Sequence, residues 1–475
     1  MATIAGYAAE SELQILGDAT VALGVLDMVF STPEWIHRRT ETIAFVTDTH
    51  RRRRVSLDLT IPKPCPGKVT WMDGNAVYLV PVDVLSKQAL RGFDSEDERG
   101  QPFPILTRRQ NGEIAWHGMV AYANEVLGQQ AHPPLDDQAC ELLRRVTQEP
   151  GDVAERYVQL FEAMARRRTD AQLLLDDDGF TTAARMLARN FLLIGAVDGV
   201  EGARRILKFS YEEPHSSEDR RGRKQRLAES LGWTPTTIEV RVPGFSDCES
   251  YHFESIAPDG IEFVDIVLGD EARVSAEGHV DPKWAVGYSR LVGESPHRAH
   301  LAVSRTANSS TSPDEFIQPT INLTLQIART GWLRAAAMMS LLVAGLMTVS
   351  LPFVVNLDAN GRRCTVPRFF SWLRPWLCHA PETADLNTDP AALMVALVGA
   401  VSVVVLRSGE HAYTANRVRP LRNAAFASAF IPLAGAWLLA FQGAGAILTD
   451  GWWALVVVAW LTFGLLAVAR RRGAR

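Results

Sequence analysis

The residues that come closest to a nucleophile arrangement are Gly244-Phe245-Ser246-Asp247-Cys248. A nucleophile elbow has the pattern G-x-S-x-G on a sharp turn between a strand and a helix, which exposes the serine hydroxyl. Here Cys248 stands in place of the last glycine, and no helical pattern follows. We therefore interpret this segment as a turn and not as a catalytic site.

A phosphate-binding loop is the second pattern that the sequence approaches. In such a loop, G-x-x-x-x-G-K-[ST], backbone amides and a lysine hold phosphate groups. Pro66-Gly67-Lys68-Val69-Thr70 contains the Gly-Lys near the end of this motif. The first glycine of that motif is missing, because Pro62 occupies its position, and Thr70 comes one position too late. This segment is also interpreted as a turn.

Residue types that bind metals are most concentrated at Asp247, Cys248 and His252. His297 and His300 are three residues apart, so they would face opposite sides of a strand. The chain has neither a C-x-x-C nor an H-E-x-x-H pattern, which zinc sites commonly show. The sequence therefore predicts no metal and no cofactor, and it assigns no catalytic residue.

Two basic runs could meet an anionic surface. At a strand edge such charges discourage edge-to-edge pairing of sheets. Beside a bilayer, each residue would contribute about 1 kcal/mol of attraction to anionic lipid. Both interpretations remain open for the two runs, which consist of Arg51, Arg52, Arg53, Arg54, Arg220, Arg221, Arg223, Lys224 and Arg226.

The cysteines form two groups along the chain. Cys65, Cys140 and Cys248 are scattered and show no metal-binding spacing, so we interpret them as ordinary thiols. Cys364 and Cys378 fall in a loop predicted to lie outside the membrane, and they would close a loop of 15 residues. We predict a disulfide between them if that compartment is oxidising.

Strands must position these residues in the first two-thirds of the chain. Apolar and polar residues alternate from about Thr40 onward, for example in Arg54 to Ile61, as in strands with one buried face. About eight such strands with Gly and Pro between them predict an antiparallel β-sandwich-like domain over 1–330. Helical periodicity over about 109–187 predicts a helical insertion within it, so the expected fold class is α+β with an added membrane domain.

Two local features of this domain are also predicted. Ala76 to Val80 and Val82 to Leu85 have the composition of two short apolar strands. Arg91 to Gln101 is polar and rich in turn residues, so we expect a loop there.

The last strand, Ile321 to Ile327, is followed closely by Ala335 to Val355, which has no charged residue. At 1.5 Å per residue these 21 residues reach about 31 Å, the thickness of a bilayer's hydrocarbon core. A membrane domain over 331–475 is therefore predicted, joined to the strands by a short spacer. Its four expected transmembrane helices are 335–355, 391–406, 423–447 and 452–469.

Arginine placement predicts the orientation of these spans. Ten arginines flank them on one side and four on the other, and the cytoplasmic side carries the excess. Both termini are therefore expected in the cytoplasm, and the segment before Phe30 lacks the pattern of an export signal. Small residues recur every four positions in the third span, which favours packing inside the bundle over homo-oligomer formation.

The net charge and the uncharged spans argue against two classes of function, nucleic-acid binding and transport. A net charge of −5 gives no basic footprint for nucleic acid, and the spans lack the ionisable residues of transport pathways. Arginine outnumbers lysine, which suggests a G+C-rich bacterial genome. In a bacterium, the predicted spans would lie in the plasma membrane. We expect a multi-pass membrane protein whose cytoplasmic module senses a signal or recruits a protein partner without catalysis. The alternatives are a membrane-tethered enzyme with a site built from distant residues and, less favoured, a small-molecule transporter.

Overall fold

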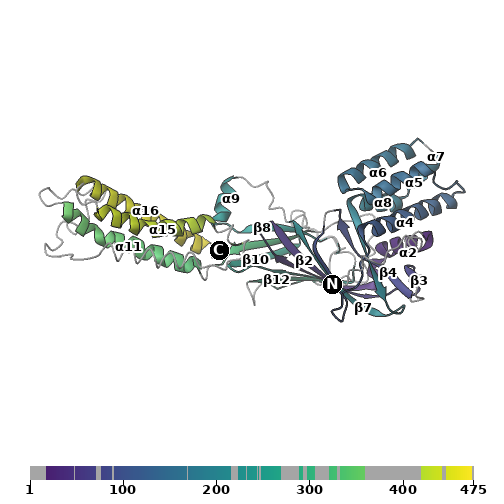
Figure 1. The fold of residues 1–475 in the computed structure, drawn as a ribbon, viewed down its shortest axis with the longest axis horizontal. Helices are drawn as coiled ribbons and strands as arrows, with labels where there is room; N and C mark the ends of the chain where they lie inside the picture. The colour runs from purple at the N-terminus through teal and green to yellow at the C-terminus, as the bar shows by residue number, and fades with distance from the viewer. Residues whose placement is uncertain are drawn as a thin grey trace.

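The structure is a computed structural model that describes residues 18–472 apart from these positions: 48, 71–75, 88–89, 168, 215–222, 232, 243, 245–247, 269–287, 292–296, 305–319, 329–331, 359–413, 415–418 and 441–444. Sheets form the middle of an elongated molecule, and helices lie at both ends (Figure 1). The mixed α+β class expected from the sequence is confirmed.

The largest sheet has seven strands in the order β11-β12-β9-β1-β2-β7-β5. The neighbours of β2 on both sides, β1 and β7, run antiparallel to it. The seven strands are β1 Ile36–Phe45, β2 His50–Thr60, β5 Arg91–Glu96, β7 Arg204–Pro214, β9 Ser250–Ile256, β11 Tyr288–Leu291 and β12 Arg298–Ser304.

Two smaller sheets complete the middle of the molecule, in the orders β10-β13-β8 and β3-β4-β6. Apolar side chains from all three sheets share one core, which includes Leu57 of β2, Val80 of β4 and Leu323 of β13. The six strands are β3 Lys68–Thr70, β4 Ala76–Ser86, β6 Asn190–Asp198, β8 Thr236–Arg241, β10 Ile261–Leu268 and β13 Thr320–Ile327.

Pairing differs from the sequence prediction in three places. β1 runs parallel to β9, so purely antiparallel pairing is wrong there; the long intervening chain supplies the crossover that a parallel pair needs. The two short strands predicted around Pro81 are one strand, β4, because an irregularity between Pro81 and Asp83 accommodates the missing amide donor. The loop predicted from Arg91 begins as strand β5, which pairs with β7 despite its polar composition.

Helices occupy the region between β5 and β6, where the sequence pattern predicts an insertion. Thr107 caps the first of them, α4, in a capping box with Gln110. These helices share a second core with Leu79 of β4 and Ile194 of β6. The helices at this end are α2 Ala19–Phe30, α3 Thr32–Trp35, α4 Arg108–Gln129, α5 Asp137–Gln148, α6 Gly151–Ala165, α7 Thr169–Asp176 and α8 Asp178–Arg189.

Three long helices, α11 Trp332–Asp358, α15 Arg419–Ala440 and α16 Gly445–Arg472, extend from the other end of the sheets (Figure 1). Helix α16 begins at Gly445, so residues 445–447, predicted to end the third span, belong to this helix, and α16 also contains the predicted fourth span, 452–469. The polar residues Thr449 and Asp450 lie within the first turns of α16, where the side chain of Asp450 is exposed.

The first and last of these helices are long and apolar enough to cross a membrane, over Leu333–Leu351 and Asp450–Arg471, and they are the two that meet this criterion among the described residues. The predicted third span overlaps α15, and the predicted second span, 391–406, lies outside the described residues.

Candidate functional site

The first basic run, Arg51 to Arg54, lies in strand β2, and its side chains point to two different environments. Arg51 and Arg53 are 6% and 2% exposed and lie on the core face with Val55. Arg54 is exposed and Arg52 is half-buried on the opposite face, because successive side chains of a strand alternate. Interpreting all four arginines as one lipid-facing patch is therefore wrong for Arg51 and Arg53.

The buried arginines belong to a network of ion pairs. Glu41 is fully buried and accepts hydrogen bonds from Arg53 Nη1 and, at 2.6 Å, from Arg39 Nε. Glu213 accepts from Arg51 Nε at 2.6 Å and from Arg53 Nη2 at 3.0 Å. Pairing of this kind is required because an isolated buried charge is strongly unfavourable.

This network connects the three sheets. Arg39 Nη2 of β1 donates to Asp83 Oδ2 of β4 at 3.0 Å, and Arg53 Nη2 of β2 donates to the Arg241 carbonyl of β8 at 2.7 Å. Gly244 is needed beside it, because a Cβ there would lie 2.2 Å from the Arg39 guanidinium carbon. The network therefore links all three sheets.

The charge states of the network follow from burial and pairing. Burial would raise the pKa of Glu41, but the adjacent guanidinium groups of Arg39 and Arg53 outweigh it and lower that pKa. Arg53 and Arg51 likewise lower the pKa of Glu213 against burial. At Asp83 burial outweighs Arg39, and the pKa is raised.

The outer face of the same sheet carries a polar groove of about 420 Å³, which we call the outer groove. Strand register places Thr42, Arg54, Ser210 and Asp94 in one transverse row across β1, β2, β7 and β5. The neighbouring row is Thr40, Ser56, Lys208 and Glu96.

Cations occupy the centre of the outer groove and carboxylates its β5 edge. Arg52 Nη2 donates to Ser210 Oγ at 2.9 Å, whereas its buried Nε has no hydrogen-bond partner within the described part of the chain. In the same part, no ion pair joins Arg52, Arg54 or Lys208 to a carboxylate. The groove can therefore accept an anion.

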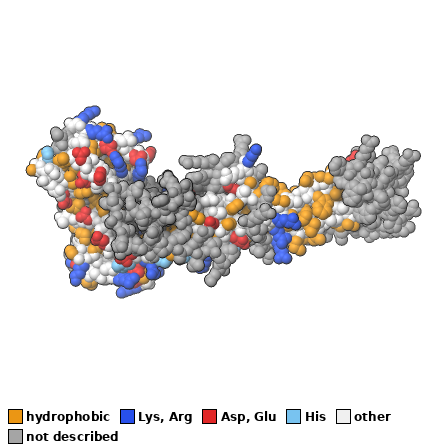
Figure 2. Space-filling view, turned by 180° about the vertical axis from the view of Figure 1, so that it is seen from behind, with side chains coloured by type: hydrophobic (Ala, Val, Ile, Leu, Met, Phe, Trp, Pro, Cys, Tyr) orange, Lys and Arg blue, Asp and Glu red, His pale blue; other side chains and the backbone are white. Residues whose placement is uncertain are grey.

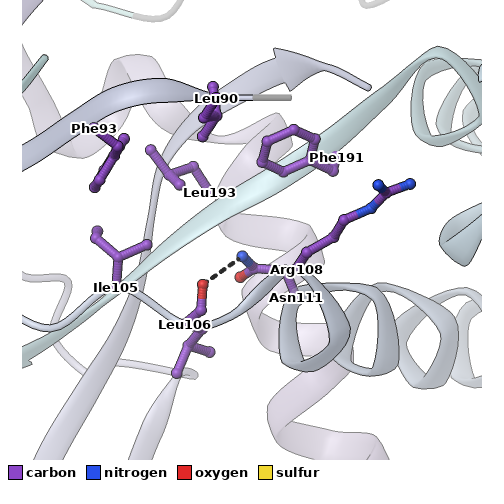
Figure 3. A pocket seen from close by; sticks show the side chains of 8 residues that line it. All are labelled: Leu90, Phe93, Ile105, Leu106, Arg108, Asn111, Phe191 and Leu193. Carbon is purple, nitrogen blue, oxygen red and sulfur yellow. Dashed lines mark hydrogen bonds between the residues drawn. The ribbon is translucent and has the colours of Figure 1, made fainter. Parts of the chain in front are cut away.

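A second pocket, of about 330 Å³, lies between β5, β6 and the start of α4 (Figure 3). Its wall is apolar except for Arg108 and the buried Asn111, which donates to the Leu106 carbonyl at 3.0 Å. The apolar residues that line it are Leu90, Phe93, Ile105, Leu106, Phe191 and Leu193. The apolar lining of this pocket could therefore hold an apolar part of a ligand.

Lys87 is a half-buried amine near Arg108, one of the residues that line that pocket. Its Nζ donates to the Val146 carbonyl at the end of α5 at 2.6 Å. Burial, together with the nearby positive charge of Arg108, lowers the pKa of Lys87 to about 7. This residue therefore titrates near neutral pH.

Two histidines meet on the outer face of β9 and β12. His252 Nδ1 lies 3.4 Å from His300 Nε2, and Ser250 Oγ lies 3.1 Å from His252 Nε2. Burial, then Arg38 and His300, lower the pKa of His252. No group of three or more metal-ligating side chains occurs among the residues with described positions.

Other residues singled out by the sequence have separate positions. Cys248 is buried, and Ser246 and Asp247 lie outside the described residues. In the second basic run Lys224 is exposed on α9 Arg223–Ser230, which also contains Arg226. Positions outside the described residues also include Arg220, Arg221, Cys364 and Cys378.

The helices α11, α15 and α16 form an apolar surface with a basic end. Large hydrophobic side chains such as Leu342, Trp437 and Leu461 are 58%, 62% and 68% exposed. Figure 2 shows Lys and Arg side chains gathered where this apolar surface meets the sheets. The exposed arginines near the helix ends that face the sheets are Arg334, Arg419, Arg470 and Arg471.

The sheets and these helices are in direct contact. Leu231 and Ile327 belong to the same apolar core as Leu333 of α11 and Leu421 of α15. Thr414 Oγ1 donates to the Asp259 carbonyl at 2.7 Å, and the Ala328 amide donates to the Gly260 carbonyl at 2.9 Å. Leu231 and Ile327 therefore pack against the ends of α11 and α15 that face the sheets.

The sequence matches none of the protein families and none of the curated proteins with which it was compared. A similar solved structure is that of a provisionally assigned nutrient binding protein from Legionella pneumophila, with 10% sequence identity and a TM-score of 0.24. The match covers 76% of this chain and 91% of that chain. A TM-score this low carries no argument about fold or function.

Proposed function

We propose that this chain is a multi-pass membrane protein whose β-rich module, residues 1–330, is held at the cytoplasmic face and senses a ligand or recruits a protein partner without catalysis. The observation that best supports this proposal is the apolar outer surface of α11, α15 and α16, with arginines at the end nearest the sheets. Lipid tails suit the apolar side chains, and the positive-inside rule puts the arginine end in the cytoplasm. In this proposal residues 331–475 form four membrane spans below a β-sandwich-like module.

The proposal distinguishes these helices from the core helices of a soluble protein. In the most apolar 18-residue stretches of these two helices, only 39% and 33% of the residues are buried within the protein. A soluble protein would expose most of this surface to water, which proteins avoid for large contiguous apolar patches. A bilayer removes that surface from water.

Fixed placement of the module supports sensing or recruitment. Leu231 and Ile327 pack against the bases of the helices, so the module has one orientation relative to the bilayer. A freely diffusing substrate would not require such an orientation, whereas a membrane-bound partner would. Transport is disfavoured, because the described apolar spans have no ionisable residue in their middles.

The experiment loosens the orientation of the β-rich module relative to the membrane and keeps the helices that anchor it. A linker of about twenty Gly and Ser residues inserted after Thr330 would behave as a flexible coil. We expect the linker variant to fractionate with membranes and to fail to rescue fully the phenotype of a deletion strain. Full rescue by it, or by residues 1–330 alone, would contradict the proposal and favour the enzyme alternative. An insertion of the same linker after residue 475 is the control.

A further inference from the structure

We propose that the outer groove binds a phosphorylated sugar, a small molecule with a phosphate group and free hydroxyl groups. This rests on the proposed function only in taking the module as a sensor, since binding itself does not depend on the membrane. The proposal rests on the two transverse rows of residues described above. In these rows the cations Arg54 and Lys208 lie near the centre of the groove, and the carboxylates Asp94 and Glu96 lie at its β5 edge.

The cationic centre fits a phosphate group. Arg52, Arg54 and Lys208 come from neighbouring strands, and within the described chain none of them forms an ion pair with a carboxylate, although Lys208 lies opposite Glu96 and Arg52 opposite Glu212 in the strand pairing. The buried Nε of Arg52 has no acceptor there, and a buried donor without an acceptor costs about 1–3 kcal/mol. An anionic oxygen would satisfy this donor and form charge-assisted hydrogen bonds with the other two cations.

The β5 edge fits hydroxyl groups. Asp94 and Glu96 are exposed and lie in the rows of Arg54 and Lys208. Arg54 and Asp94 are two strands apart, which corresponds to roughly 10 Å. A phosphate held at the centre therefore leaves a sugar ring within reach of both carboxylates, which accept hydrogen bonds from hydroxyl groups.

The mixed charge of the groove also disfavours other anions. A simple anionic surface, such as a phospholipid bilayer, would be repelled by Asp94 and Glu96 as it approached Arg54. Inorganic phosphate would engage the cations but leave the carboxylates without donors. Selectivity for a sugar phosphate over phosphate alone is thus the distinguishing property of this site.

The experiment uses the full chain purified in detergent, with isothermal titration of glucose 6-phosphate, glucose and inorganic phosphate, and flotation with vesicles containing phosphatidylinositol phosphate. We expect glucose 6-phosphate to bind at least tenfold more tightly than inorganic phosphate, and glucose to give no heat. Arg54→Gln and Lys208→Gln should each weaken binding at least tenfold, whereas Lys224→Gln, an exposed lysine on α9, should have no effect. Asp94→Asn combined with Glu96→Gln should remove the preference over inorganic phosphate.

Four results would overturn the proposal: no binding of glucose 6-phosphate, equal binding of inorganic phosphate, insensitivity to Arg54→Gln and Lys208→Gln, or binding to lipid headgroups in vesicles but not to the soluble sugar phosphate. Thermal unfolding of each variant shows that it is folded. Failure of the membrane proposal would appear separately, as loss of the chain from the membrane fraction with ligand binding intact.

Discussion

Arg39 Nη2 lies 3.0 Å from Asp83 Oδ2, and both side chains are 1% exposed, although they belong to different sheets. This pair is one end of a network that continues through Glu41 and Arg53 to Glu213. The network is therefore a cross-link between sheets, and its members should be sensitive to single substitutions.

Replacing Glu41 with Gln should destabilise the protein by about 3–5 kcal/mol. The change leaves Arg39 and Arg53 buried next to a neutral group, and breaking a buried ion pair from one side has a cost of this size. Chemical denaturation of the purified chain measures it. Asp58→Asn is the matched control, because its partner Arg204 is largely exposed and such pairs contribute about 0–1 kcal/mol. Equal effects of the two substitutions would refute a structural role of the network.

Lys87 should make stability depend on pH. Because the pKa of Lys87 is lowered to about 7 in the folded protein, the unfolded chain binds more protons between pH 7 and pH 10. Stability therefore rises with pH through this window, by about 1–2 kcal/mol up to pH 9 after allowing for partial exposure. Lys87→Met should remove most of this rise, and denaturation at pH 7 and pH 9 tests it. An unchanged pH dependence in the variant would show that Lys87 is not responsible.

The arginine distribution predicts the topology of the proposed membrane domain. Reporter domains fused after residue 330 and after residue 475 should both be located in the cytoplasm, since the arginines near both junctions favour that side. Protease protection of spheroplasts provides an independent measurement. An external location of either reporter would contradict the four-span arrangement.

Cys364 and Cys378 remain a predicted disulfide, in a segment outside the described residues. A bridge closing a loop of this length would stabilise it by about 3 kcal/mol in the chain-entropy treatment. Labelling of intact cells with an impermeant thiol reagent should be weak without reductant and strong after it. Strong labelling of both positions before reduction would rule the bridge out, and Cys364→Ser should expose Cys378 to the reagent.

The sequence predicted the faces of β2 but not the partners of its residues. A period of two puts Val55, Leu57 and Leu59 on the core face, and these residues are buried. The same period puts Arg51 and Arg53 on that face, so the signal for buried arginines was present. The positive charge that all four arginines share does not distinguish the buried pair from the other two.

What the sequence could not provide is the identity of the opposing strands. Glu41, Asp83 and Glu213 complete the buried network from three different strands, and no local pattern marks them as partners. The outer groove likewise requires the lateral order β1-β2-β7-β5, which brings Asp94 beside Ser210. Strand order depends on long-range packing, and local propensity does not determine it.

The parallel pairing of β1 with β9 has a consequence for synthesis on the ribosome. About 200 residues separate the two strands in sequence, so at 5–20 residues per second β1 emerges roughly 10–40 s before its partner exists. During this interval β1 can pair with β2, while its other edge has no strand partner and α4 to α8 can fold from local contacts. All seven strands of the largest sheet precede α11 in the sequence, so this sheet can be completed before α11 is translated.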